Sequence, residues 1–157
     1  MPTKHNICGI AMAMLAAVVM AACEQPVVYS HYEPTPLSGW AHNDTVHFQI
    51  PKMKKTGASA TDIGLRINTT YPFLSLSLVV DRTVFPSFTT YTDTLSCDLI
   101  DKKGQAKGQG LSVFQYLFPL SDINLNEGDS LAIEVRHDMR MELLPGISDI
   151  GIQLTSK

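Results

Sequence analysis

The histidines and their acidic neighbours are the first residues in this sequence whose types could support chemistry. The only dense group is His42-Asn43-Asp44-Thr45-Val46-His47, which carries two imidazoles and a carboxylate. On a strand, Asp44 and His47 would point to opposite faces, because they are an odd number of residues apart. The group therefore lacks the spacing of a metal site. We expect solvated histidines in a loop or at a strand end, and no metal.

Motifs that would indicate catalysis are missing. The sequence has no Gly-x-Ser-x-Gly elbow and no phosphate-binding glycine motif. Gly104, Gly108 and Gly110 come nearest, and we expect them to form a hairpin loop in which glycine allows a positive φ. Acidic pairs such as Asp93 with Asp98 would serve as general acid and base only at a fixed separation, which the sequence does not set. We therefore expect no enzymatic activity and no cofactor.

The first 23 residues have the pattern of a bacterial lipoprotein signal peptide. Lys4 and His5 precede an apolar stretch, Ile7 to Met20, which has the length of a signal-peptide core and is too short to span a bilayer. The stretch ends in Met20-Ala21-Ala22-Cys23, which resembles a lipobox. We expect residues 1–22 to be removed and Cys23 to be lipidated, which anchors the chain to a membrane, the outer membrane rather than the inner one.

Two of the three cysteines are thereby accounted for. Cys8 is removed with the signal peptide and Cys23 is acylated, so Cys97 is the only free thiol and no intramolecular disulfide is expected. Cys97 lies in the alternating segment Thr94 to Leu99. This context favours a small, half-buried strand residue over a reactive nucleophile.

Composition limits the class of protein. The chain has 157 residues, a formal net charge of −3 and 45% hydrophobic residues, which excludes a disordered chain and a basic nucleic-acid-binding module. Its length suits one domain. Pro26, Pro34 and Pro36 indicate a lipidated N-terminus and extended tether over residues 23–39, although Val27 to Tyr29 could instead pair as an edge strand. The domain itself is then expected over residues 40–157.

Period-two alternation dominates that domain. Antiparallel strands in a β-sandwich have this pattern, with turn-rich pieces such as Pro51 to Ala60 and Asp81 to Pro86 between them. We therefore predict an all-β fold, an antiparallel β-sandwich of about seven to eight strands. Its expected strands include Val46–Ile50, Ile63–Ile67, Leu74–Val80, Phe88–Ile100, Leu111–Phe118, Leu131–Val135 and Ile150–Leu154.

The C-terminal part is the most distinctive. Val135-Arg136-His137-Asp138-Met139-Arg140 is followed by Leu143-Leu144-Pro145-Gly146-Ile147 and Asp149-Ile150-Gly151-Ile152. Together with Arg66-Ile67-Asn68, Tyr71-Pro72-Phe73 and the lipobox, these residues resemble the gliding-motility-associated lipoprotein GldH family of Bacteroidetes. The resemblance implies a protein of the cell envelope linked to gliding and to the type IX secretion apparatus, and it implies no enzymatic activity.

Four residues that match this family pattern are candidates for binding a partner. They are Arg66, His137, Arg140 and Asp149. If exposed together, the three basic residues would bind a partner's carboxylate or an anionic glycan. If buried, the basic residues would pair with Asp138 or Asp149 and lock the final hairpin.

Two functions remain open. The first is a lipid-anchored, non-catalytic interaction or accessory subunit of a motility- or secretion-associated envelope complex. The alternative is a cell-surface glycan-binding module, in which exposed rings of Tyr91, Tyr116 or Trp40 would form a stacking platform.

Three short segments resemble the Asp-Ser/Thr-aliphatic sites at which Bacteroidetes O-glycosylate envelope proteins. They are Asp44-Thr45-Val46, Asp93-Thr94-Leu95 and Asp129-Ser130-Leu131. The resemblance makes Thr45, Thr94 and Ser130 candidate O-glycosylation sites, of which we expect at least one to be used in the native host.

Overall fold

Alternating apolar residues build eleven strands in residues 26–157, the part of the chain that this computed structural model describes. The signal peptide and Cys23 lie outside the described residues. The strands are β1 (Val27–Pro34), β2 (Trp40–Ala41), β3 (Val46–Ile50), β4 (Gly57–Asn68), β5 (Ser75–Phe85), β6 (Thr89–Asp98), β7 (Val113–Pro119), β8 (Ile123–Leu125), β9 (Ser130–His137), β10 (Leu143–Leu144) and β11 (Ile147–Ser156).

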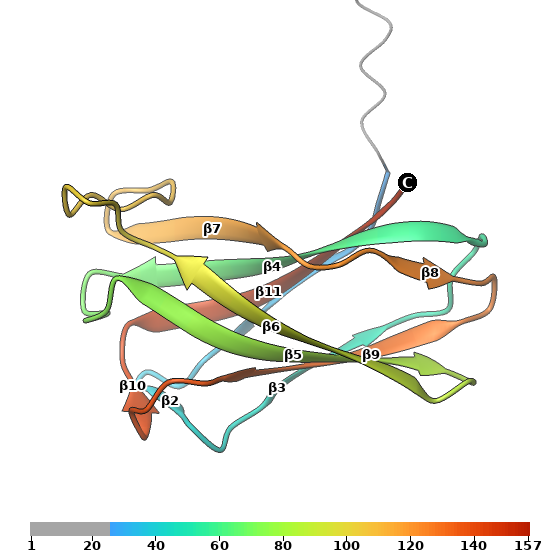
Figure 1. Ribbon diagram of the computed structural model, residues 1–157, viewed down its shortest axis with the longest axis horizontal. Coiled ribbons are helices and arrows are strands. Elements are labelled where there is room, and N and C mark those ends of the chain that lie inside the picture. Colours follow the sequence, from blue (N-terminus) through green and yellow to red (C-terminus); the bar gives the residue numbers. More distant parts are fainter. Residues whose placement is uncertain (1–25) are drawn as a thin grey trace, which may run out of the picture.

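The strands form two main antiparallel sheets that face each other (Figure 1). The five-stranded sheet has the order β1-β11-β4-β7, and β8 pairs with the first residues of β4. The four-stranded sheet has the order β3-β9-β5-β6, and a small ribbon joins β10 to β2. All of these pairings are antiparallel, which confirms the predicted fold class.

The core lies between the inner faces of the two sheets. Ile63 and Leu65 of β4 face Leu78 and Val80 of β5, and all four side chains are fully buried. On each strand the intervening residues point outward, as the period of two predicts. Each buried aliphatic side chain of this size contributes about 1.5–3 kcal/mol relative to an exposed one.

Residues 27–34 correct the predicted tether. Val27 to Pro34 form β1, which pairs with β11 along the edge of the five-stranded sheet. An edge strand tolerates Pro34 because its missing N–H costs no ladder hydrogen bond. The described part of the domain thus begins at β1, and the edge-strand alternative describes this segment correctly.

The predicted turns at Pro51–Ala60 and Asp81–Pro86 are also shorter than expected. β4 begins at Gly57, and β5 continues to Phe85. Inside the second segment, the charged Arg82 occupies an inward position between Val80 and Val84, and this charge interrupts the apolar period without ending the strand. The strand count of seven to eight was low because β2, β8 and β10 are too short to show a period.

Candidate functional site

The outer face of the five-stranded sheet contains an arrangement built on two glycines. Tyr32 of β1 lies in register with Gly151 of β11, which in turn pairs with Gly64 of β4. A Cβ atom at Gly151 would lie 2.5 Å from the Tyr32 ring, and a Cβ atom at Gly64 would lie 2.4 Å from the Tyr32 hydroxyl oxygen, so neither position has room for a side chain. The absence of side chains at these two positions therefore allows the tyrosine ring to lie flat across the neighbouring strands.

Arg66 covers the other side of the Tyr32 ring. Its Cζ atom lies 4.0 Å from the ring centroid, in cation–π geometry. The Gln115 side chain of β7 donates a hydrogen bond of 3.3 Å from Nε2 to the Tyr32 hydroxyl. Within residues 26–157, no carboxylate oxygen lies within 4.0 Å of the Arg66 guanidinium. The cation is thus held in position by an aromatic ring rather than by an ion pair.

Asp149 adds a negative charge beside this cation. It is the register partner of Arg66, next to an irregularity in the β4–β11 pairing, and is partly exposed. We call Tyr32, Arg66, Gln115 and Asp149 the Arg66 surface. Further along the same face, burial raises the pKa of the Asp62 carboxyl above its usual value. The face therefore combines one stacked cation with two carboxyl groups.

His137 does not belong to this surface. Its side chain is 1% exposed and packs edge-to-face against Trp40, with 5.2 Å between ring centroids. Its Nε2 lies 3.2 Å from the Trp40 carbonyl oxygen, and the Met139 N–H donates to Nδ1 at 3.4 Å. Both nitrogens are therefore satisfied by the neutral tautomer with a proton on Nε2. The predicted pairing with Asp138 or Asp149 is wrong, because backbone groups take its place.

Burial lowers the pKa of His137, and the hydrogen bond to the Trp40 carbonyl and the nearby Asp138 charge oppose this effect only in part. Arg140 is exposed in the connection between β9 and β10. Of the four candidate partner-binding residues, the structure brings together Arg66 and Asp149 and leaves the other two outside the Arg66 surface.

The rings proposed as a glycan platform are mostly buried. Trp40 is 0% exposed and donates its indole N–H to the Asp44 carbonyl, and Tyr116 is 8% exposed with its hydroxyl on the Leu99 carbonyl. Tyr91, at 46%, is exposed. The stacking platform is therefore not formed by these three residues together.

A buried ion pair between β5 and β6 was not predicted. Arg82 is fully buried and donates from Nη2 to Asp93 Oδ2 at 2.6 Å and to Ser121 Oγ at 2.6 Å, and from Nη1 to the Ser121 carbonyl at 2.7 Å. These contacts tie the four-stranded sheet to the connection between β7 and β8. Opposite charges at inward positions on both strands of a hairpin were the signal that could have revealed this pair.

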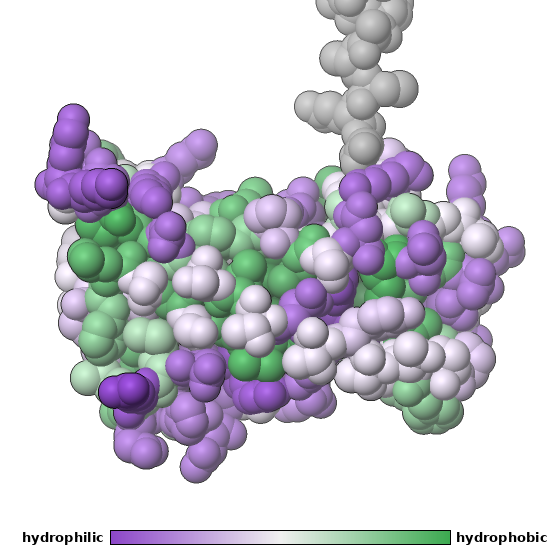
Figure 2. Space-filling model, in the orientation of Figure 1, coloured by the Kyte–Doolittle hydropathy of each residue, from purple (hydrophilic) through white to green (hydrophobic). Residues whose placement is uncertain are grey.

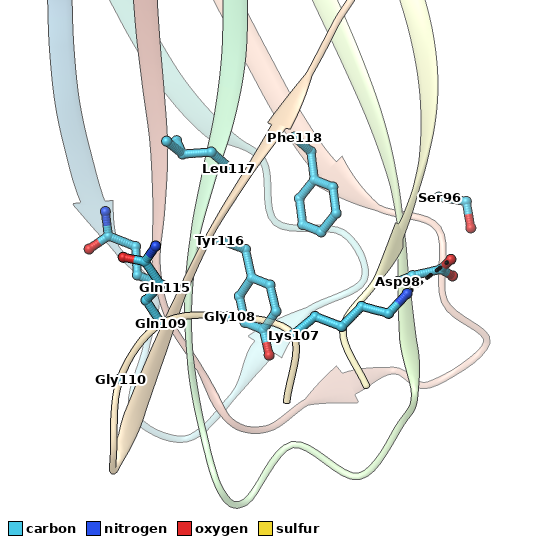
Figure 3. Close-up of a pocket in the computed structure, with 10 residues that line it drawn as sticks. All are labelled: Ser96, Asp98, Lys107, Gly108, Gln109, Gly110, Gln115, Tyr116, Leu117 and Phe118. Atoms are coloured by element: carbon cyan, nitrogen blue, oxygen red, sulfur yellow. Dashed lines mark ion pairs between the residues drawn. The ribbon is translucent and has the colours of Figure 1, made fainter. Parts of the chain in front are cut away.

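A groove of about 840 Å³ lies between the edge strands β6 and β7 (Figure 3). Tyr116 and Phe118 point from β7 into it, and Lys107 reaches across to Asp98, with 3.6 Å between Nζ and Oδ2. The groove is thus the side opening of the sandwich, apolar on the β7 side and charged at the Asp98 end.

The remaining chemical candidates have plain structural roles. Cys97 is fully buried, and desolvation raises the pKa of its thiol to about 12, so it is poorly suited to act as a nucleophile. Within residues 26–157, no three histidine, cysteine or acidic side chains come together to hold a metal ion. Of the candidate glycosylation sites, Thr94 is exposed on β6, whereas Thr45 and Ser130 are partly buried.

Exposed apolar side chains gather at one end of the sandwich. Figure 2 shows apolar colouring at its left-hand end, where Figure 1 places β10 and the loops that lead into β5 and β7. Leu74 before β5, Leu111 before β7 and Leu143 of β10 are exposed there, and Leu37, in the connection between β1 and β2, is also exposed. No described segment forms a helix long and apolar enough to cross a membrane.

Comparison with known proteins places this β-sandwich among lipid-anchored proteins of the bacterial cell envelope. The model of the GldH lipoprotein family matches residues 27–154, and the chain therefore belongs to this motility-associated lipoprotein family. The gliding motility lipoprotein GldH of Flavobacterium johnsoniae is 28% identical over 151 residues, which cover 92% of this chain and 94% of that protein.

Solved structures give weaker likenesses. A family GH115 4-O-methyl-alpha-glucuronidase, BtGH115A, has a TM-score of 0.49 and 10% sequence identity, over 87% of this chain and 18% of that chain. The Eiger TNF of S. frugiperda has a TM-score of 0.33 and 14% identity, over 82% of this chain and 92% of that chain.

Proposed function

We propose that the chain is a non-catalytic accessory subunit of a motility- or secretion-associated envelope complex, anchored in the outer membrane through lipid on Cys23. In this role the domain binds a protein partner through the Arg66 surface. Membership of the GldH family supports the association with motility. The open outer face of the five-stranded sheet supports a role in protein contact.

The observation that carries this proposal is the state of Arg66. Stacking on Tyr32 restricts the guanidinium, so little further side-chain entropy is lost when a partner binds. Its N–H groups have no carboxylate partner within residues 26–157 and can take one from another protein in a two-bond arrangement. Asp149, of opposite charge on the neighbouring strand, would fix the orientation of that partner.

The test is affinity purification of the acylated protein from crosslinked host membranes, followed by mass spectrometry. Arg66→Ala should reduce recovery of the partner by at least about tenfold, because loss of a charge pair at an interface costs on the order of 2 kcal/mol or more. Arg66→Lys should not restore it, since a lysine lacks the planar fork. Arg136→Ala is the matched control, because Arg136 already pairs with Asp81 at 2.6 Å on the other sheet.

Equal recovery with Arg66→Ala and Arg136→Ala would contradict the assignment of the Arg66 surface. If the folded, acylated wild-type protein brings down no protein partner, the subunit role itself is wrong. In that case, binding of the purified domain to an array of bacterial glycans becomes the measurement to make.

A further inference from the structure

β6 is a long edge strand with one unpaired side. It lies at the end of the four-stranded sheet and pairs only with β5, from Ser75↔Asp98 to Val84↔Thr89, without any register shift. Its sequence, TTYTDTLSCD, contains no lysine, proline or glycine. Proteins commonly use lysine, proline, a bulge or an inward-pointing charge to prevent an edge strand from pairing with another chain. β6 has none of the first three, and its one inward-pointing charge, Asp93, is neutralised by Arg82.

The other three sheet edges are protected. β1 carries a register irregularity and ends at Pro34. β3 has only five residues. The outer side of β7 is bridged near its start, because the backbones of Gln109 and Gln115 exchange two hydrogen bonds of 2.8 and 3.0 Å. Among β1, β3, β6 and β7, the outermost strands of the two main sheets in the described part of the chain, β6 alone is long, regular and without any backbone bridge on its outer side.

The alternation of backbone groups shows which amides of β6 are free. The Asp138 N–H donates to the Ser77 carbonyl at 2.8 Å, which directs the backbone of Ser77 toward β9. Neighbouring residues direct their backbone groups to opposite sides, so Leu78 and its register partner Leu95 bond to each other. The backbone groups of Thr92, Thr94 and Ser96 then point away from β5.

The groove beside β6 provides space for a strand that would use these groups. Ser96 and Asp98 of β6 form one of its sides, and Tyr116 and Phe118 of β7 project into it from the other (Figure 3). A strand paired with β6 would place every second side chain toward this opening. The apolar rings and the Lys107–Asp98 pair at one end suit a segment that alternates apolar and polar residues.

We propose that β6 is the acceptor of an extended β-strand from an envelope protein, which adds to the four-stranded sheet as a fifth strand. This inference rests on the proposed subunit role and gives it a second, physically separate contact. Main-chain hydrogen bonds would supply affinity, and the groove would supply selectivity for alternate side chains. The mature N-terminus does not reach this site, because only three residues separate Cys23 from β1 at an edge of the other sheet.

The experiment measures amide hydrogen exchange of the full acylated chain, alone and in the complex purified from crosslinked host membranes. A bound strand should slow exchange at Thr92, Thr94 and Ser96 by at least about tenfold, because exposed edge amides become hydrogen-bonded. Ser96→Pro should abolish this protection, since it removes an outward N–H and leaves the β5 ladder intact. Ser96→Ala keeps the N–H and should behave like the wild type.

Each alternative outcome has a separate meaning. A complex that forms while β6 exchange stays unchanged overturns the strand-acceptor proposal and leaves the subunit role standing. Protection of β6 in the purified chain alone, together with a dimer that Ser96→Pro dissociates, shows pairing between two copies and also overturns it. If no complex forms at all, both proposals fail.

Discussion

At the scale of single residues, His137 makes the domain sensitive to mild acid. Its Nδ1 accepts a hydrogen bond from the Met139 N–H, and burial lowers its pKa below the usual 6.5. The unfolded chain therefore binds a proton at a higher pH than the folded chain does. The stabilising contribution is complete above pH 6.5 and is lost as the pH falls from there through the folded-state pKa.

We therefore expect the free energy of unfolding to decrease between pH 7.5 and pH 5 more steeply in the wild type than in His137→Gln, which cannot titrate. Urea unfolding followed by the fluorescence of Trp40, the single tryptophan, measures this difference. Since Trp40 packs edge-to-face on His137, its fluorescence reports the same region. Parallel pH profiles of the two proteins would contradict the role assigned to His137.

Thr94 is the candidate glycosylation site with the greatest exposure. Its side chain projects from the outer face of β6, whereas Thr45 and Ser130 are partly buried. If the native protein is O-glycosylated, we expect Thr94 to carry the glycan, and Thr94→Val to lower the intact mass by the mass of that glycan. Mass spectrometry of the protein from its own host measures this. An intact mass equal to that of the lipidated polypeptide would show that the protein is not glycosylated and would contradict this prediction.

At the scale of elements, the Arg82–Asp93 pair holds β5 against β6. Asp93→Ala would leave the fully buried Arg82 charge without its carboxylate, and should lower the free energy of unfolding by about 3 kcal/mol or more. Arg82→Met in the same chain removes the unpaired charge and should recover much of the loss. Chemical denaturation of the single and double variants measures both effects.

Asp98→Ala is the matched control for this prediction, because Asp98 also lies on β6 and pairs with a cation, Lys107. Both side chains of this pair are well exposed, so we expect the free energy of unfolding to change by less than about 0.5 kcal/mol. Similar losses in Asp93→Ala and Asp98→Ala would show that burial of Arg82 is not what makes its pair important.

The elements that the sequence predicts correctly are those with a clear period of two. β3 was predicted with its exact bounds, Val46–Ile50, because its alternation is regular and Pro51 follows it. β2 and β10 have two residues each and contain no periodic signal. The inward position of Arg82 was missed because its neutralising partners come from other segments of the chain.

The candidate site was predictable only in part. Arg66 and Asp149 were named from the family resemblance, and their adjacency depends on the β4–β11 register, which alternation alone does not fix. Tyr32 was missed because prolines on either side suggested a tether. Gly64 and Gly151, at outward positions of two strands, were the available signal that another side chain lies across them.

At the scale of the whole molecule, the lipid that we propose on Cys23 would hold the sandwich close to the membrane through β1. Four residue steps separate Cys23 from Val27, a distance of at most about 14 Å when fully extended. Val27 pairs with Thr155 near the end of β11, so Ser156 would lie near the proposed anchor. Leu111 lies in the connection before β7, at the opposite end of the domain in Figure 1.

This arrangement can be measured on the acylated protein in lipid vesicles. A dye on a cysteine introduced at Ser156 should be quenched more strongly by headgroup-labelled lipids than a dye at Leu111. The difference follows from the short connection to Cys23. Equal quenching at the two positions would contradict an orientation fixed by β1.

The most direct test of the Arg66 surface compares the two outer sheet faces by site-specific crosslinking in host membranes. Cys97 is buried with a raised thiol pKa, so a cysteine introduced at the surface can be labelled selectively with a maleimide photocrosslinker. Gln153→Cys lies on the same face as Arg66, and Glu134→Cys lies on the outer face of the four-stranded sheet. We predict adducts to an envelope protein from position 153, lost with Arg66→Ala, and none from position 134. Adducts from position 134 alone, or from position 153 regardless of Arg66, would contradict the account.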